Sequence, residues 1–166
     1  MRLKDKVAII TGGSRGIGLA TVKAFIEAGA AVILTASSQG NADKAVASLK
    51  EQYPDATIGG ISPNLADLAD VEKNFDEVVA TYGHLDILVN NAGVSERTPI
   101  SKYTEELFDK VMDLNVKGVY NCTKAAVKHM EAQGSGVILN TSSMVSRYAQ
   151  PAGVTYPTSK FAVDGM

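Results

Sequence analysis

The chain has 166 residues, of which 45% are hydrophobic and 20% are charged, and its formal net charge is −2. This length and composition are typical of one ordinary globular domain and exclude a mainly disordered chain. The balanced charge argues against a nucleic-acid or anionic-membrane partner, and no apolar run is long enough for a membrane span or a signal peptide. We expect a cytoplasmic protein, and its lone cysteine, Cys122, is interpreted as a small buried hydrophobe in a reducing compartment.

Short apolar runs alternate with stretches of helical spacing along the chain. Strands are predicted at residues 7–10, 31–34, 57–61, 86–89 and 137–139. Helices are predicted at residues 17–28, 42–53, 68–82 and 105–133, the last of them broken near Asn115. Gly29 and Gly83 stand where helices are expected to end, and Thr104 where one is expected to begin. This alternation predicts an α/β fold with a doubly wound parallel sheet, helices on both faces, and a single domain over residues 1–166.

A glycine-rich turn, Thr11 to Gly18, follows the first predicted strand and precedes a helix. Glycines allow a tight turn and let a phosphate approach the free N–H groups of the helix start. The alternative interpretation of the turn is a strand-to-helix connection that merely needs several glycines. Its Gly-x-x-x-Gly-x-Gly spacing departs from the commoner Gly-x-Gly-x-x-Gly fingerprint. Together with the preceding threonine, it resembles the turn of the short-chain dehydrogenase/reductase family.

Two more segments carry this resemblance, Asn90-Asn91-Ala92-Gly93 after the fourth strand and Tyr156-Pro157-Thr158-Ser159-Lys160 near the end. In a helix, residues four apart share a face, so we expect the Tyr156 phenol and the Lys160 ammonium to lie together. Because proline disfavours helical dihedrals in the residue before it, Tyr156 is expected at the very start of that helix. A lone Tyr-x-x-x-Lys pair is more often a pair of surface residues on a helix, so the resemblance depends on the other motifs as well.

The resemblance extends from residue 7 to residue 166 and implies a Rossmann-type fold with four catalytic residues, Asn115, Ser143, Tyr156 and Lys160. Ser143 stands thirteen residues before Tyr156, which is the family's spacing, whereas the adjacent Ser142 is the competing candidate. The alternative for Asn115 is a solvent-facing side chain. A free tyrosine has a pKa of about 10, so a nearby cation is needed to favour the phenolate at neutral pH.

The roles that the resemblance implies form one mechanism. Tyr156 exchanges a proton with the substrate oxygen while a hydride passes between the nicotinamide and the carbon, and Ser143 polarises the carbonyl. Lys160 lowers the pKa of the tyrosine and holds the nicotinamide ribose, and the Asn115 backbone fixes a water in the proton relay. No metal is implied.

The resemblance also implies a set of cofactor contacts around the glycine turn and the ends of the next strands. They are Thr11, Gly12, Ser14, Arg15, Gly16, Ile17, Gly18, Ser37, Ser38, Asn64, Leu65, Asn91, Ala92, Gly93, Tyr156 and Lys160. Residues 35–38 hold no acid to repel a ribose 2′-phosphate, and Arg15 supplies a cation for it, so NADP(H) is predicted over NAD(H). The other interpretation is a solvated Arg15, with Ser37 and Ser38 only capping a helix. Asn64 stands where the family usually has an aspartate that contacts adenine.

The predicted function is therefore an NADP(H)-dependent oxidoreductase that interconverts a ketone and a secondary alcohol. A 3-oxoacyl thioester is our first substrate hypothesis, with sugar acids, polyols and hydroxysteroids open. A non-catalytic NADP(H)-binding module or an inactive fragment is the alternative. Family members continue through two further strands and a substrate-covering loop, so we expect the chain to be incomplete at its C-terminus and the full-length form to be a homodimer or homotetramer.

Overall fold

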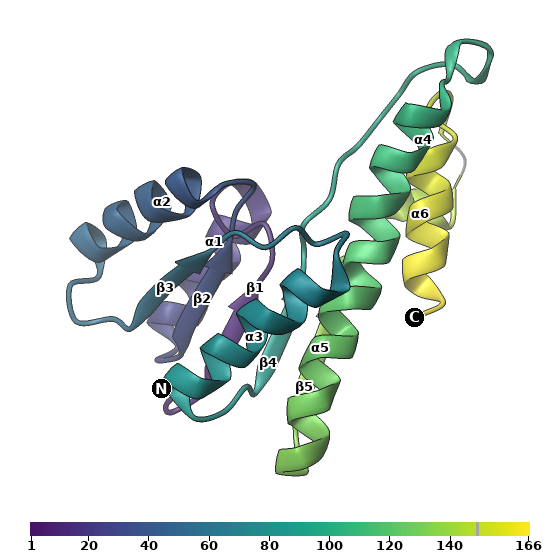
Figure 1. Cartoon of the computed structure of the whole chain (residues 1–166). Helices are drawn as coiled ribbons and strands as arrows, with labels where there is room; N and C mark the ends of the chain where they lie inside the picture. The colour runs from purple at the N-terminus through teal and green to yellow at the C-terminus, as the bar shows by residue number, and fades with distance from the viewer. Residues whose placement is uncertain (149) are drawn as a thin grey trace.

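The structure is a computed structural model and describes residues 1–148 and 150–166. Five strands form one parallel sheet in the order β3-β2-β1-β4-β5 (Figure 1). Their bounds are β1 (Val7–Ile10), β2 (Ala31–Thr35), β3 (Ile58–Ile61), β4 (Ile87–Asn90) and β5 (Val137–Asn140). Because β2 and β4 flank β1 on opposite sides, the strand order reverses there and opens a crevice at the carboxyl ends of the strands.

Helices cover both faces of the sheet. Their bounds are α1 (Gly16–Glu27), α2 (Gln39–Gln52), α3 (Leu68–Tyr82), α4 (Glu105–Met112), α5 (Gly118–Gln133) and α6 (Thr155–Asp164), with short turns η1 (Ile100–Lys102) and η3 (Met144–Ser146). One apolar core joins α1 and α2 to the sheet, with Val22 and Leu49 at its centre. A second core joins α3 and α5 to the opposite face, with Phe75 and Cys122 at its centre. The predicted doubly wound α/β fold is confirmed.

The predicted strands agree with the observed ones to within one residue at each end. The second helix is the largest difference, because α2 begins at Gln39 and not at Ala42. Ser38 caps it by accepting a hydrogen bond from the Asn41 amide at 3.3 Å, and the weakly apolar first turn hides this start from a periodicity search. The predicted buried state of Cys122 is confirmed, and burial raises the pKa of its thiol to about 12.

The predicted break in the long helix is a turn of π-helix, η2 (Asp113–Lys117), that joins α4 to α5. Figure 1 shows α4 and α5 as one long rod, with α6 lying beside α4. Asn115 lies in η2 and is fully buried, so a solvent-facing position for it is wrong. π-helical turns inside α-helices are frequent at functional sites because they redirect a side chain.

β5 is one of the two edges of the sheet and is the most exposed strand. Val137 and Leu139 are 54% and 48% exposed, whereas all four residues of β1 and of β4 are buried. None of the helices in residues 1–148 and 150–166 is both long and apolar enough to cross a bilayer.

Candidate functional site

A cavity of about 730 Å³ opens beyond the carboxyl ends of β1, β2 and β4. Most of the cofactor contacts implied by the sequence line it, namely Gly12, Ser14, Arg15, Gly16, Ile17, Gly18, Ser37, Asn64, Leu65, Asn91, Ala92 and Gly93. Thr11, Ser38, Tyr156 and Lys160 do not line this cavity. The volume falls in the range of ligand-binding clefts in proteins.

The start of α1 faces this cavity without a side-chain cap. α2, α3 and α4 each begin with a side chain that accepts an amide hydrogen bond, from Ser38, Asp67 and Thr104. In α1 the residue at this position is Arg15, which makes no such bond, and the first turn carries no acid. Its N–H groups and the positive end of the helix dipole are therefore free for an anion.

Glycine at position 18 is required by close packing inside the turn. A Cβ there would lie 2.2 Å from the Gly12 carbonyl oxygen, so any side chain would push α1 away from β1. At Gly16, by contrast, φ is +57° and an added Cβ would meet nothing within 4 Å. The turn is thus tightly packed at Gly18 and faces open space at Gly16, on the side where a ligand would lie.

Thr11 and Asn91 brace the glycine turn against the end of β4. The Thr11 hydroxyl oxygen accepts hydrogen bonds from the amides of Asn91 and Ala92, each at 2.9 Å. In return, the Asn91 side-chain amide donates to the Thr11 carbonyl oxygen at 2.9 Å. The amide of Gly12 is also used internally, because it donates to the Thr35 hydroxyl at 3.1 Å. Thr11 and Asn91 thus connect two of the motifs that the sequence places eighty residues apart.

Of the three polar residues expected to contact the adenosine, Ser37 and Asn64 line the cavity, and all three make hydrogen bonds within their own segments. Ser38 caps α2, and the Ser37 hydroxyl accepts from the Asn41 side chain at 3.3 Å. The Asn64 side-chain oxygen accepts from the Ala66 amide at 3.1 Å and stabilises its own loop. Arg15 is exposed, and it is the one charged side chain among the described residues that line the cavity.

Tyr156 and Lys160 lie together on α6, as the four-residue spacing predicts. The Lys160 ammonium nitrogen lies 5.8 Å from the centroid of the Tyr156 ring, and it donates a hydrogen bond to the Thr141 carbonyl oxygen at 2.6 Å. Only 6% of Lys160 is exposed. Burial lowers the pKa of Lys160, and the carboxylate of Asp164 one turn later opposes that shift. α6 begins at Thr155, so Tyr156 lies in the first turn but one residue later than expected.

Asn115 joins the loop after β4 to α6. Its side-chain oxygen accepts from the Val94 amide at 2.8 Å, and its side-chain nitrogen donates to the Val94 carbonyl oxygen at 2.9 Å. The same nitrogen donates to the Ser159 hydroxyl at 3.0 Å. Ser159 is fully buried, and the sequence marks it only as an unassigned position inside the Tyr-x-x-x-Lys segment.

Ser143 lies just after β5, in the segment that Lys160 holds through Thr141. Its hydroxyl accepts from the Val145 amide at 3.4 Å at the start of η3, and in residues 1–148 and 150–166 it makes no hydrogen bond to Tyr156. The Ser142 hydroxyl is directed to α6, where it lies 3.4 Å from the Lys160 carbonyl oxygen. Both serines border a second hollow of about 610 Å³.

Known proteins resemble this chain along its whole length. Residues 6–166 match the family model described as short chain dehydrogenase. A 3alpha-hydroxysteroid dehydrogenase of Mediterraneibacter gnavus is 57% identical over 166 residues, which are all of this chain and 66% of that relative. The 3-oxoacyl-(acyl-carrier-protein) reductase FabG of Thermotoga maritima is 39% identical over 169 residues, covering all of this chain and 67% of that relative.

A solved structure shares the fold. The gluconate 5-dehydrogenase from Burkholderia cenocepacia, in complex with NADP and tartrate, matches with a TM-score of 0.91 and 34% identity, over 98% of this chain and 63% of the other. The chain therefore spans between 63% and 67% of the lengths of these three proteins.

Proposed function

This chain belongs to the short chain dehydrogenase family, and on that basis we propose that it transfers a hydride between a nicotinamide dinucleotide and a carbonyl or secondary alcohol. The observation that carries the proposal is the Lys160 ammonium, held 5.8 Å from the centre of the Tyr156 ring by its hydrogen bond to Thr141. A non-catalytic binding module has no need for a buried cation beside a phenol.

The residues around the larger cavity fit a dinucleotide. The uncapped N-terminus of α1 would hold its phosphates, the open space at Gly16 admits them, and Lys160 would hold the nicotinamide ribose. When bound, the nicotinamide supplies or accepts the hydride.

The chain's own residues would handle the proton. In the reducing direction, Tyr156 donates its phenolic proton to the oxygen of the substrate as negative charge develops there. The Lys160 cation stabilises the phenolate that remains, because an opposite charge nearby favours the ionised form. The Ser143 hydroxyl donates a hydrogen bond to the same substrate oxygen. Asn115 acts on the geometry, since it ties Val94 on the cavity side to Ser159 on α6.

NADP(H) is the cofactor that the charges favour. Residues 35–38 at the end of β2 include no acid, and Arg15 is the charged side chain at the cavity. A guanidinium there attracts a ribose 2′-phosphate, which NAD(H) lacks. Fluorescence titration of the protein with NADPH and with NADH is expected to give at least tenfold tighter binding of NADPH. Equal affinities contradict this preference.

A hydroxysteroid is the substrate class that similarity favours, because the relative at 57% identity is a 3alpha-hydroxysteroid dehydrogenase. A 3-oxoacyl thioester, our first hypothesis from the sequence alone, becomes the second candidate on the 39% identity to a 3-oxoacyl-(acyl-carrier-protein) reductase. Turnover of a 3-oxosteroid and of a 3-oxoacyl thioester, compared as kcat/KM, distinguishes the two.

Tyr156→Phe tests the reaction itself. Removing one hydroxyl is expected to lower kcat on any accepted ketone by at least a thousandfold while the dissociation constant for NADPH changes less than threefold. Loss of NADPH absorbance measures the first and fluorescence titration the second. A Tyr53→Phe variant, which removes the same atom from the residue that ends α2 and does not border the hollow at Ser143, is the matched control. Near-wild-type turnover by Tyr156→Phe would overturn the assignment of the proton donor.

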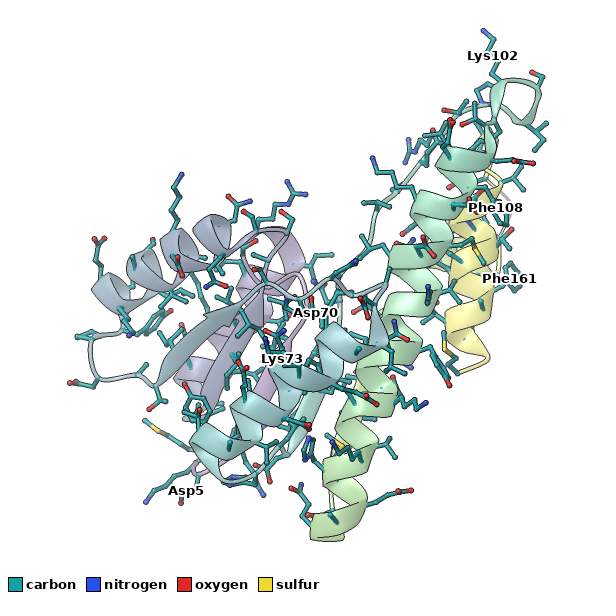
Figure 2. The ribbon with its side chains drawn as sticks, viewed as in Figure 1. Asp5, Asp70, Lys73, Lys102, Phe108 and Phe161 are labelled. Atoms are coloured by element: carbon teal, nitrogen blue, oxygen red, sulfur yellow. The ribbon has the colours of Figure 1, made fainter. Side chains whose placement is uncertain are left out.

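Self-association and a cytoplasmic location are also part of this proposal. Large apolar side chains are exposed on α4, α5 and α6, at Phe108, Tyr120 and Phe161, and Figure 2 shows Phe108 and Phe161 on the neighbouring helices α4 and α6. Sedimentation velocity over a range of concentrations tests the homo-oligomer, and a monomer throughout contradicts it. Cell fractionation tests the location.

A further inference from the structure

Two loops meet next to Tyr156 through contacts that none of the four catalytic residues makes. The first is the loop after β4, at Glu96 and Thr98, and the second is the segment that leads into α6, at Gln150 and Gly153. We call these four residues the loop clamp. We propose that the loop clamp sets the position of Tyr156, so that Gln150 and Gly153 are positioning residues for proton transfer. This inference rests on the proposed function.

Three hydrogen bonds form the clamp. The Gln150 side-chain nitrogen donates to the Glu96 carbonyl oxygen at 3.5 Å and to the Gly153 carbonyl oxygen at 2.9 Å. The Gly153 amide donates to the Thr98 carbonyl oxygen at 3.2 Å. One side chain and one backbone amide thus join the two loops over a short distance, and all the acceptors are backbone atoms that no rotamer change can move.

Gly153 is the point of closest approach between the two loops. Its φ is +84°, and a Cβ at this position would lie 1.9 Å from the Glu96 carbonyl oxygen. That oxygen belongs to the backbone, so the clash cannot be relieved by a side-chain movement. Any residue other than glycine must separate the loops or distort the segment three residues before Tyr156.

The partner loop is itself held in one shape. The Glu96 carboxylate accepts hydrogen bonds from the amide of Thr98, at 2.7 Å, and from the Thr98 hydroxyl. These bonds close a tight local turn, which presents the carbonyl oxygens of Glu96 and Thr98 to the clamp. The loop therefore has a fixed shape, against which α6 is positioned.

The clamp and Asn115 together hold Tyr156 from both sides. Asn115 binds the same loop at Val94, two residues before Glu96, and binds α6 at Ser159, three residues after Tyr156. The clamp binds the loop at Glu96 and Thr98 and holds the chain at Gly153, three residues before Tyr156. The chain is thus attached to the loop on each side of Tyr156, which restrains α6 from rotating or sliding relative to the loop. A misplacement of about 1 Å at a reacting group costs on the order of a hundredfold in rate.

The test compares two glycines of nearly equal backbone conformation. Gly153 has φ +84° with no room for a Cβ, whereas Gly83 at the end of α3 has φ +87° and nothing within 4 Å of an added Cβ. Gly153→Ala is expected to lower kcat on the best ketone at least tenfold while the dissociation constant for NADPH changes less than twofold. Gly83→Ala carries the same backbone strain and is expected to keep kcat within twofold of wild type.

A second variant keeps the test decisive if Gly153→Ala fails to fold. Gln150→Glu preserves the shape of the side chain but removes its N–H donors, and a fivefold or larger loss of kcat is expected with little change in NADPH binding. The readout that a merely structural role would not move is the pH dependence of kcat. It is expected to shift in both clamp variants, because displacing the first turn of α6 moves the Tyr156 phenol relative to the Lys160 ammonium, which the Thr141 carbonyl holds.

The outcomes separate the clamp from the proposed function. If Tyr156→Phe is inactive but Gly153→Ala and Gln150→Glu keep wild-type kcat and pH profiles, the clamp proposal is overturned and the function stands. If Gly153→Ala and Gly83→Ala lose activity equally, the clamp is also overturned. If Tyr156→Phe is as active as wild type, the proposed function fails and the clamp fails with it.

Discussion

The N-terminal region (residues 1–94) and the C-terminal region (residues 95–166) are held together in different ways. In the N-terminal region, β1 and β4 are buried on both faces between two apolar cores. In the C-terminal region, α5 shares the second core through Cys122 and Met130, whereas the segment after β5 carries exposed apolar side chains such as Met144. Its functional groups are attached instead by hydrogen bonds from Asn115, Lys160 and Gln150.

This difference matches the tasks of the two regions in the proposed function. Binding a dinucleotide requires a rigid turn and a free helix end. Apolar packing supplies this rigidity, although the hydrophobic effect itself has no preferred direction. Proton transfer requires one side chain to point in one direction, which hydrogen bonds fix because they depend on angle. The hydrogen bonds of the C-terminal region thus contribute orientation, whereas the two apolar cores, one of which includes α5, contribute rigidity.

Phe75→Ala is expected to produce the largest effect on stability and tests this division directly. Phe75 on α3 is fully buried in the core that joins α3 and α5 to the sheet. Replacing such a side chain leaves a cavity and costs about 3–5 kcal/mol of the free energy of unfolding. Urea unfolding measures this change. Phe108→Ala, at a side chain that is 44% exposed on α4, is the control and is expected to cost about 1 kcal/mol or less. Equal losses would refute the division.

Asn115→Ala is expected to give an intermediate effect, because it removes hydrogen bonds and not apolar packing. The Val94 amide and carbonyl lose their partner, whereas the Ser159 hydroxyl loses one donor but keeps its hydrogen bond to the Tyr156 carbonyl oxygen. Unsatisfied buried groups cost about 1–3 kcal/mol each before water compensates. We expect the free energy of unfolding, measured in urea, to fall by about 2–3 kcal/mol. We expect kcat to fall by a larger proportion than the free energy of unfolding. Asn74→Ala, whose partner Asp70 lies on its own helix, is the control. A loss no larger than that of the control would show that α6 is held by other contacts.

Asp86→Asn is expected to give the smallest effect, which is present at neutral pH and disappears in acid. Burial opposes the charge of Asp86, but hydrogen bonds from the Lys6 side chain and the Val7 amide outweigh it and lower the pKa of Asp86. A carboxylate with a lowered pKa in the folded state adds stability that is fully present above the unfolded pKa of about 3.9. That stability is lost as the pH falls through the folded pKa.

The measurement for Asp86 is the free energy of unfolding at pH 7, 4 and 3. Wild type is expected to lose stability more steeply over the acid range than Asp86→Asn, while an exposed Asp55→Asn variant keeps the wild-type slope. The same acid slope in wild type and Asp86→Asn would contradict the role of this carboxylate in fastening β1 to the start of β4.

Much of the fold and part of the site follow from local signals in the chain. The strands are short apolar runs, and α3 is predicted with both ends correct because Gly83 ends it in a left-handed conformation. The pairing of Tyr156 with Lys160 follows from helix geometry alone. Apolar periodicity places the start of α2 three residues late, whereas the alternative interpretation of Ser38 as a helix cap agrees with the structure.

The partners of the functional residues were beyond sequence reasoning. Asn115 looks like an awkward polar residue inside a helix, and only the π-helical turn and the packing of α6 bury it against Val94 and Ser159. Thr141 is an unmarked residue after a strand, yet its carbonyl holds Lys160. Gln150 and Gly153 lie in a segment with no periodicity at all.

The sequence by itself determined the order of elements, the glycine turn and the spacing of the proposed catalytic residues, because these depend on interactions between residues that are near in the chain. Only the tertiary structure decided how residues from distant segments meet: Thr11 with Asn91, Asn115 with Ser159, and Gln150 with Glu96. The physical reason is that a backbone carbonyl or amide is the same group at every position. Which of them accepts a bond from a distant side chain is set by packing.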